Sequence, residues 1–274
     1  CWVVARFRPA ALVCFGGFMS VGPALACWLA GVPIHLHEAN LRAGKAIRML
    51  APLATSIHAP PSVGLSGAEV HPGGFPLRDE IRPLDRGASR RALGLPGEGR
   101  LLLVMGGSQG AASLTHWSES VASRLAASGC HLLCLTGPGG ADRVDAHGAC
   151  VARYLPFCDH MAEAYSAADL AVSRAGAGTL AELAACRTPA VLVPYPRAAD
   201  DHQTANALAR ERAGAALLVR ESELSALGDR VLALLGDPAA LGIMREALGR
   251  EHAANRWEDL VDSLVPAPRR RLAS

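Results

Sequence analysis

Two polar side chains, Thr179 and Glu182, follow a glycine-rich turn in the second half of the chain. Residues 173–185 read SRAGAGTLAELAA, and Gly176 and Gly178 form the turn. The threonine and the glutamate have the T-x-x-E spacing of a capping box, which closes the first turn of a helix. Alternatively, the helix end binds a phosphate and the carboxylate accepts hydrogen bonds from vicinal sugar hydroxyls. The spacing alone favours the capping box.

Two similar glycine turns follow other apolar runs, CFGGFMSVGP at 14–23 and VMGGSQGAAS at 104–113. In an open α/β sheet, ligands bind where such turns lie, at the carboxyl ends of the strands. Tight packing between strand and helix is the other explanation for the glycines. No turn continues into Gly-Lys-Ser/Thr, and none is a clean G-x-G-x-x-G, which disfavours a P-loop and a dinucleotide-dependent dehydrogenase.

A polar cluster, DDHQTAN at 200–206, follows the apolar run that ends in VPYP. Asp200 and Asp201 suit a helix start, whereas His202, Gln203 and Asn206 add hydrogen-bond donors and acceptors. The cluster is therefore either a cap or a part of a binding site at a strand end.

A second cluster, PIHLHEAN at 33–40, ends in Glu38 and Asn40. His35 and His37 lack further residues at metal-ligand spacing, so we expect no metal and no cofactor. The spacing of residues also gives no Ser/His/Asp or Cys/His nucleophile arrangement.

Short apolar runs alternate along the chain with alanine-rich helical patterns, which predicts an α/β fold with parallel strands and crossover helices. A proline- and glycine-rich stretch at 71–83 places a domain boundary near residue 80. The predicted strands are 11–15, 34–37, 101–105, 131–136, 170–173 and 190–193. The predicted helices are 23–30, 43–50, 87–93, 111–127, 160–167, 179–186, 201–213, 222–235 and 238–250.

The composition excludes several classes of protein. A net charge of +2 disfavours a dedicated nucleic-acid binder, and the eight scattered cysteines indicate a reduced, cytoplasmic protein. The uncharged stretch 10–34 is long enough to cross a bilayer, but its glycines and prolines favour a strand, a turn and a helix. There is no signal-peptide pattern, and the first residue, Cys1, indicates that the sequence starts inside a longer protein.

Taken in order, the motifs closely resemble the MurG family of glycosyltransferases. Enzymes of that family add N-acetylglucosamine (GlcNAc) from its UDP donor to the lipid-linked muramyl-pentapeptide of peptidoglycan synthesis. The resemblance runs from Gly16 to about residue 220. It rests on GGFMSVGPALA, HEAN, GFPLR at 74–78, GGSQGA at 106–111, LPFCDHMAEAYSAADLAVSRAGAGTLAELAA at 155–185, PAVLVPYP and DDHQTANA.

The resemblance implies a GT-B fold of two Rossmann-like domains with parallel sheets. Residues 1–80 would be part of an N-terminal acceptor-binding domain whose first part is missing, and residues 81–255 the UDP-sugar-binding domain. Residues 256–274 would form a tail or helix that packs back toward the N-terminal domain.

The resemblance also implies a donor site. Glu182 would bind the ribose hydroxyls, and Gly176, Ala177, Gly178 and Thr179 would hold the diphosphate together with Ser108 and Arg78. Cys158 and Met161 would border the uracil, while Gln203 and His202 would contact the GlcNAc hydroxyls. The acceptor side would include Gly16, Gly17, Ser20, Glu38 and Asn40.

Several positions depart from the family pattern, mostly on the acceptor side. Phe75 replaces the asparagine of GNPxR, and Ala39 replaces the glutamine of HEQN. Ile47 and Thr115 each stand where the family usually has an asparagine. The family's first glycine-rich loop, with the histidine suspected as general base, would lie before Cys1, so no catalytic residue is assigned.

The implied reaction is a metal-independent, inverting displacement on UDP-GlcNAc by the muramyl 4-hydroxyl of undecaprenyl-pyrophosphoryl-MurNAc-pentapeptide. The implied location is the cytoplasmic face of the bacterial inner membrane, held peripherally at an anionic surface. The alternatives are another GT-B enzyme that uses a UDP-sugar, and a non-catalytic nucleotide-sugar-binding fragment that needs a partner. A nicotinamide-dependent dehydrogenase is a third alternative.

Overall fold

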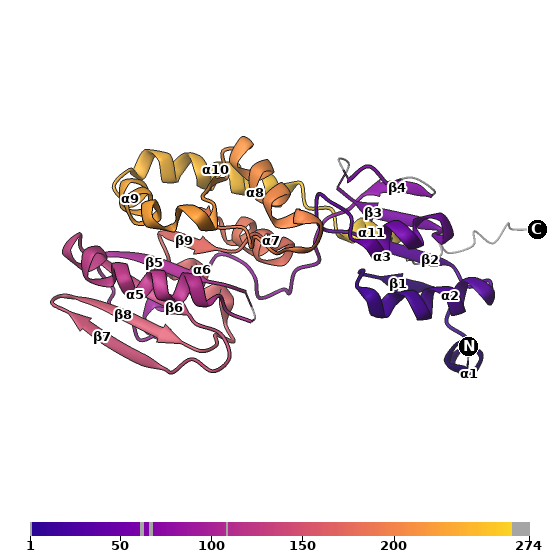
Figure 1. Ribbon diagram of the computed structural model, residues 1–274, viewed down its shortest axis with the longest axis horizontal. Helices are drawn as coiled ribbons and strands as arrows, with labels where there is room; N and C mark the ends of the chain where they lie inside the picture. Colours follow the sequence, from indigo (N-terminus) through magenta and orange to yellow (C-terminus); the bar gives the residue numbers. More distant parts are fainter. Residues whose placement is uncertain (1, 61–62, 66–67, 108, 265–274) are drawn as a thin grey trace, which may run out of the picture. The chain divides into compact units, whose positions relative to one another are not determined.

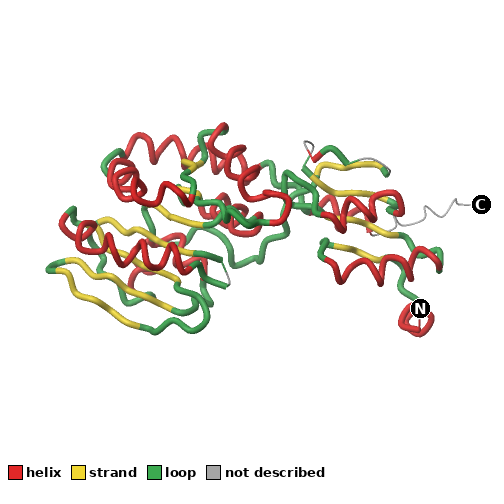
Figure 2. Tube along the Cα trace, viewed as in Figure 1, coloured by secondary structure: helices red, strands yellow, loops and turns green. Residues whose placement is uncertain are grey.

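The structure is a computed structural model that describes residues 2–60, 63–65, 68–107 and 109–264. The chain divides into two compact units, one formed by residues 1–76 with 254–274 and the other by residues 77–253. Figure 1 labels the helices and strands of both, and Figure 2 shows how helix and strand alternate along each.

The larger unit is built on a sheet whose described strands follow the order β11-β10-β9-β5-β6-β8-β7. Neighbouring strands are parallel except β7, which is antiparallel to β8. The strands are β5 (Arg100–Met105), β6 (Cys130–Leu135), β7 (Arg143–His147), β8 (Cys150–Leu155), β9 (Leu170–Ser173), β10 (Ala190–Leu192) and β11 (Ala216–Leu218).

Helices cover both faces of this sheet because successive side chains of a strand point to opposite faces. On β5, Leu101 and Leu103 pack into one hydrophobic cluster and Leu102 and Val104 into another. The first cluster includes Leu93 and Leu95, which follow α4 (Arg86–Ala92), and residues of α6 (Met161–Ala167), α7 (Ala177–Cys186) and α8 (His202–Arg212). The second includes residues of α5 (Ala112–Ala127), α9 (Leu224–Leu235) and α10 (Pro238–Ala253).

The smaller unit has a parallel sheet with its described strands in the order β1-β2-β3-β4. The strands are β1 (Leu12–Cys14), β2 (Ile34–His37), β3 (Ser56–Ala59) and β4 (Glu69–Pro72). The helices are α1 (Trp2–Phe7), α2 (Val21–Leu29), α3 (Lys45–Leu50) and α11 (Glu258–Leu264). Helix α11 comes from the C-terminal part of the chain, which rejoins this unit. Just before α11, the Asn255 side chain accepts a hydrogen bond from the N–H of Phe75 at 2.7 Å and donates one to its carbonyl oxygen at 3.0 Å.

The predicted fold class, two Rossmann-like domains with parallel sheets, is confirmed, with one correction at the edge of the larger sheet. There, β7 and β8 form an antiparallel hairpin around Gly148, whose φ of 64° suits a tight turn. The hairpin was not predicted, and neither were β3, β4, β11 and α1. These elements are short or carry charged and polar residues, which weakens their hydrophobic pattern.

The uncharged stretch 10–34 folds as predicted into a strand, a turn and a helix, namely β1, a 3₁₀ turn (Phe18–Ser20) and α2. Among the described residues, no helix has the length and apolar character that crossing a membrane requires.

Candidate functional site

The motif residues of the larger unit follow the carboxyl ends of its parallel strands. The turn at 174–176 follows β9, GGSQGA follows β5, and Cys158 follows β8. Because these strand ends share one edge of the sheet, the structure places the proposed donor-binding residues along that edge. Ser108 alone of these residues lies outside the described part of the chain.

Helix α7 begins earlier than predicted, which excludes one of the two interpretations of Thr179 and Glu182. Its first residue is Ala177 and its N-cap is Gly176, with φ −73° and ψ 142°. Thr179 is therefore inside the helix, and no side chain caps α7. The capping-box interpretation is wrong, and the Glu182 carboxylate is available for another role.

The carboxylate of Glu182 is held in place by two neighbours. The Tyr165 hydroxyl donates a hydrogen bond to its Oε2 at 2.7 Å, and Arg78 Nη2 lies 3.7 Å from its Oε1. The side chain of Glu182 remains 21% exposed. Burial, reinforced by the charge of Glu182, raises the pKa of Tyr165 well above its ordinary value. Tyr165 thus stays a neutral donor that orients an accessible carboxylate.

Gly176 is not required by the fold. A Cβ at this position would meet no atom within 4 Å, and its φ is available to any residue. In contrast, a Cβ at Gly106 of the second turn would lie 2.3 Å from the backbone nitrogen of Ala111. Tight packing therefore requires a glycine at position 106. At Gly176 the space is open and leaves room for a ligand at the end of the helix.

Two side chains of α8 hold the residue before Gly176. Gln203 Oε1 accepts hydrogen bonds from the backbone N–H groups of Ala175 at 3.2 Å and Tyr195 at 2.9 Å. Buried Asn206 donates to the carbonyl oxygen of Ala175 at 3.1 Å. Within the described residues the amide nitrogen of Gln203 has no hydrogen-bond partner, so it can donate to a ligand.

The segment just before α8 is strained. Asp200 and Asp201 have φ of 52° and 53°, in the left-handed region that non-glycine residues adopt at a cost of about 1 kcal/mol or more. The next residue, His202, contacts the carbonyl oxygen of Ala199 through Nδ1 at 2.6 Å. The imidazole is thereby fixed at the start of α8, beside Gln203.

Buried Arg174 connects several of the strand ends. Its guanidinium donates to both carboxylate oxygens of Glu221, at 2.9 and 3.1 Å, and to Ser113 Oγ at 3.0 Å. It also donates to the carbonyl oxygens of Val193 and Pro194 at the end of β10. The hydrogen bonds from Arg174 lower the pKa of Glu221. Arg174 thus fixes the loop that leads into Gly176.

Cys158 and Met161 lie at the turn into α6, half-buried against the hydrophobic cluster on that face of the sheet. Burial raises the pKa of the Cys158 thiol, so the thiol stays neutral. Both side chains thus present apolar surface at the carboxyl edge of the sheet, which suits contact with a flat base.

The acceptor-side residues lie in the smaller unit. Gly16 and Gly17 have φ of 82° and 80°, and the Ser20 hydroxyl donates to the carbonyl oxygen of Gly17 at 2.7 Å. The buried carboxylate of Glu38 accepts from the backbone and side chain of Asn40 and from the N–H of Gly44, each at 2.9 Å. Glu38 therefore shapes its own loop and orients Asn40.

Four residues of the site were not predicted from the sequence, namely Tyr165, Arg174, Ser113 and Glu221. Tyr165 belongs to an alanine-rich helix and resembles a core residue, and Glu221 is 47 residues from its partner Arg174. Only Arg174 carried a signal, as a charged residue between a buried strand and a glycine turn.

Comparisons with known proteins assign the family. The model of the glycosyltransferase family 28 C-terminal domain matches residues 101–261, and that of the N-terminal domain matches residues 2–59. The chain belongs to glycosyltransferase family 28. The C-terminal match contains every donor-site residue predicted from the sequence except Arg78.

Named relatives narrow the family further. A protein of Opitutus terrae, named UDP-N-acetylglucosamine–N-acetylmuramyl-(pentapeptide) pyrophosphoryl-undecaprenol N-acetylglucosamine transferase, is 43% identical over 89% of this chain and 67% of its own length. A protein of Clavibacter sepedonicus with the same name is 41% identical over 94% of the chain and 72% of its own length.

Solved structures agree with this assignment. MurG of Acinetobacter baumannii has a TM-score of 0.73 and 26% identity, over 96% of this chain and 75% of its own. The glycosyltransferase of kitacinnamycin has a TM-score of 0.66 at 16% identity, over 97% of this chain and 78% of its own, and shares the fold. The predicted membership of the MurG family is confirmed.

Proposed function

We propose that the protein transfers GlcNAc from UDP-GlcNAc to the 4-hydroxyl of lipid-linked N-acetylmuramyl-pentapeptide, the step that the names of its relatives describe. The observation that carries the donor half of this proposal is Glu182, an accessible carboxylate oriented by Tyr165. Glu182 lies on the helix whose open amino end is Gly176. This arrangement fits a nucleoside diphosphate, with ribose at the carboxylate and phosphates at the helix end.

The chemistry follows from where negative charge develops. As the bond from the sugar to the diphosphate breaks, charge accumulates on the leaving UDP. The N–H groups at the amino end of α7 point toward that charge, and Arg78 adds a cation beside Glu182. We infer a direct, inverting displacement.

We infer that the protein acts peripherally at the cytoplasmic face of the bacterial inner membrane, because its proposed acceptor is a lipid. Helix α2 exposes Leu25, Trp28 and Leu29 to solvent, and α1 exposes Trp2 and Phe7. Exposed apolar clusters of this kind mark contact surfaces, and an anionic bilayer is the contact that we propose for them.

Replacing Gly176 by aspartate is expected to weaken UDP binding at least tenfold without destabilising the fold. Aspartate is a favourable N-cap residue, and the position has room for a side chain, so the free energy of unfolding should stay equal or rise. The new carboxylate would repel the diphosphate. The matched control, Gly176→Asn, caps equally well without the charge. If both variants bind UDP like the wild type in titration calorimetry, the diphosphate does not lie at this helix end.

Replacing Tyr165 by phenylalanine is expected to weaken UDP binding several-fold, because Glu182 loses the donor that orients it. The loss of one hydrogen bond to a partly exposed carboxylate should cost about 1 kcal/mol of stability. Tyr154→Phe is the control. It also removes the hydroxyl of a buried tyrosine, but Tyr154 lies on β8 and its neighbour is Arg143 of β7, not Glu182. Equal UDP affinities for the two variants would exclude an orienting role for Tyr165.

The transfer itself is tested with the protein, labelled UDP-GlcNAc and a lipid-linked MurNAc-pentapeptide. The proposal predicts a labelled disaccharide-lipid, and none when UDP-GlcNAc is replaced by another UDP-sugar. Binding of UDP-GlcNAc without transfer to this acceptor, but with transfer to another, would overturn the acceptor. Failure to bind UDP-GlcNAc would overturn the donor.

A further inference from the structure

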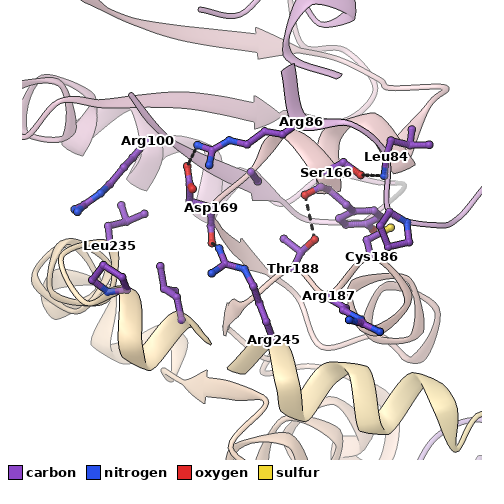
Figure 3. A pocket seen from close by; sticks show the side chains of 15 residues that line it. Leu84, Arg86, Arg100, Ser166, Asp169, Cys186, Arg187, Thr188, Leu235 and Arg245 are labelled. Atoms are coloured by element: carbon purple, nitrogen blue, oxygen red, sulfur yellow. Dashed lines mark hydrogen bonds and ion pairs between the residues drawn. The ribbon is translucent and has the colours of Figure 1, made fainter. Parts of the chain in front are cut away.

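A pocket lies in the larger unit, at the amino ends of the strands of its sheet. It has a volume of about 540 Å³ and is lined by residues at the amino ends of β5 and β9, including Arg100 and Asp169. Thr188 and Arg245 form other parts of its wall (Figure 3), and Tyr165 lines it as well. The proposed donor site is at the carboxyl ends of these strands, and Tyr165, whose hydroxyl donates to Glu182, is shared between the two sites. The volume is in the range of small-molecule sites.

Positive charge dominates this pocket. Arg86, Arg100, Arg187 and Arg245 line it together with one carboxylate, that of Asp169. That carboxylate is already engaged, since its Oδ2 lies 2.6 Å from Arg86 Nη2 and 2.8 Å from the N–H of Leu101. Figure 3 shows Arg86 and Arg245 both directed at Asp169, with Arg100 and Arg187 on different sides of the pocket.

A second arginine, Arg90, also balances the charge of Asp169. Arg90 is buried, and its Nη2 lies 3.2 Å from Asp169 Oδ2. Burial first, and then the charge of Arg86, lower the pKa of Arg90. Among the described residues, neither Arg100, Arg187 nor Arg245 has a carboxylate partner. The pocket therefore has at least three guanidinium groups whose charge the protein itself does not balance.

Arg187 has a backbone conformation that favours glycine. It is the C-cap of α7 with φ 52° and ψ 39°, the left-handed conformation in which helices usually place glycine. Its guanidinium lies against Gly249 of α10, where a Cβ would approach Arg187 Nε to 3.2 Å. A strained, exposed arginine at a position that favours glycine is better explained by a ligand than by stability.

We propose that this pocket binds a phosphate-bearing ligand through its unbalanced guanidinium groups, namely Arg245 in the wall and Arg100 and Arg187 at its two sides. Guanidinium groups bind phosphate with paired N–H···O bonds, and several of them in one pocket suit a di-anion better than a carboxylate. The phosphate has two possible sources, a soluble phosphorylated metabolite and a phospholipid headgroup, and both present the same chemistry to the arginines.

The test uses titration calorimetry with inorganic pyrophosphate and co-sedimentation with phosphatidylglycerol vesicles. In the double variant Arg187→Gly, Arg245→Gln, the Kd should rise at least tenfold for whichever of the two probes the wild type binds. Arg212→Gln, an exposed arginine at the end of α8, should change it less than twofold. Arg187→Gly alone should weaken binding while its melting temperature stays equal or rises, which separates binding from folding.

Arginine-dependent binding of pyrophosphate would support a soluble ligand. Arginine-dependent binding of the vesicles, without binding of pyrophosphate, would support a lipid headgroup. Equal binding by the wild type and the double variant would overturn the proposal, because the probe would then bind elsewhere. Absence of binding of either probe to the wild type at low salt would also overturn it.

Discussion

Replacement of Glu182 by alanine is expected to abolish the rise in melting temperature that UDP gives the wild-type chain. A carboxylate that accepts hydrogen bonds from sugar hydroxyls contributes about 1.5–3 kcal/mol, so the affinity should fall on the order of 10- to 100-fold. The variant should also lose about 1–3 kcal/mol of stability, because the buried hydroxyl of Tyr165 loses its acceptor.

Glu182→Gln separates these two effects. The amide oxygen can still accept from Tyr165, so the stability should be close to that of the wild type. The charge and one acceptor oxygen are lost, so the affinity for UDP should lie between those of the wild type and the alanine variant. If Glu182→Ala destabilises the protein but binds UDP normally, the carboxylate serves only the fold and our site assignment fails.

The second large effect is expected from Arg174→Met, which should destabilise the larger unit by about 3 kcal/mol. The change leaves Glu221 without its cation and the carbonyl oxygens of Val193 and Pro194 without a donor. Removal of one partner of a buried ion pair costs about 3–5 kcal/mol, and the 21% exposure of the Glu221 side chain favours the lower end. Chemical denaturation measures the loss.

Two further measurements assign that loss to the ion pair. The double variant Arg174→Met, Glu221→Met should recover part of the stability, because no unpaired carboxylate remains. The lowered pKa of Glu221 also contributes stability that is complete above its ordinary value near 4.5 and is lost as the pH falls below it. This loss should be smaller in Arg174→Met. Identical pH profiles would show that Arg174 does not act through Glu221.

The fold was largely predictable because buried parallel strands leave a strong pattern. The runs that became β5, β6 and β9 are almost entirely apolar, since helices cover both faces of the sheet. The hairpin β7–β8 escaped prediction because it lies at the sheet edge, where Arg143 and Asp145 interrupt the pattern. The strand β3 escaped because its buried residues include Ser56 and His58.

The candidate site was predictable only where it was local. The glycines, Glu182 and Gln203 stand in short motifs whose order carries the resemblance. Whether Glu182 caps a helix depended on where α7 begins, and a shift of two residues, from Thr179 to Ala177, decided it. Tyr165 and Glu221 join the site through tertiary contacts, which no spacing in the sequence reveals.

The most direct test of the donor site is hydrogen–deuterium exchange of the chain with and without UDP-GlcNAc. Our account predicts slower exchange of backbone amides at 174–183 and 203–206. It also predicts that the Gly176→Asp variant loses this protection while remaining folded. Protection confined to other segments, or protection at 174–183 that persists in Gly176→Asp, would contradict the account.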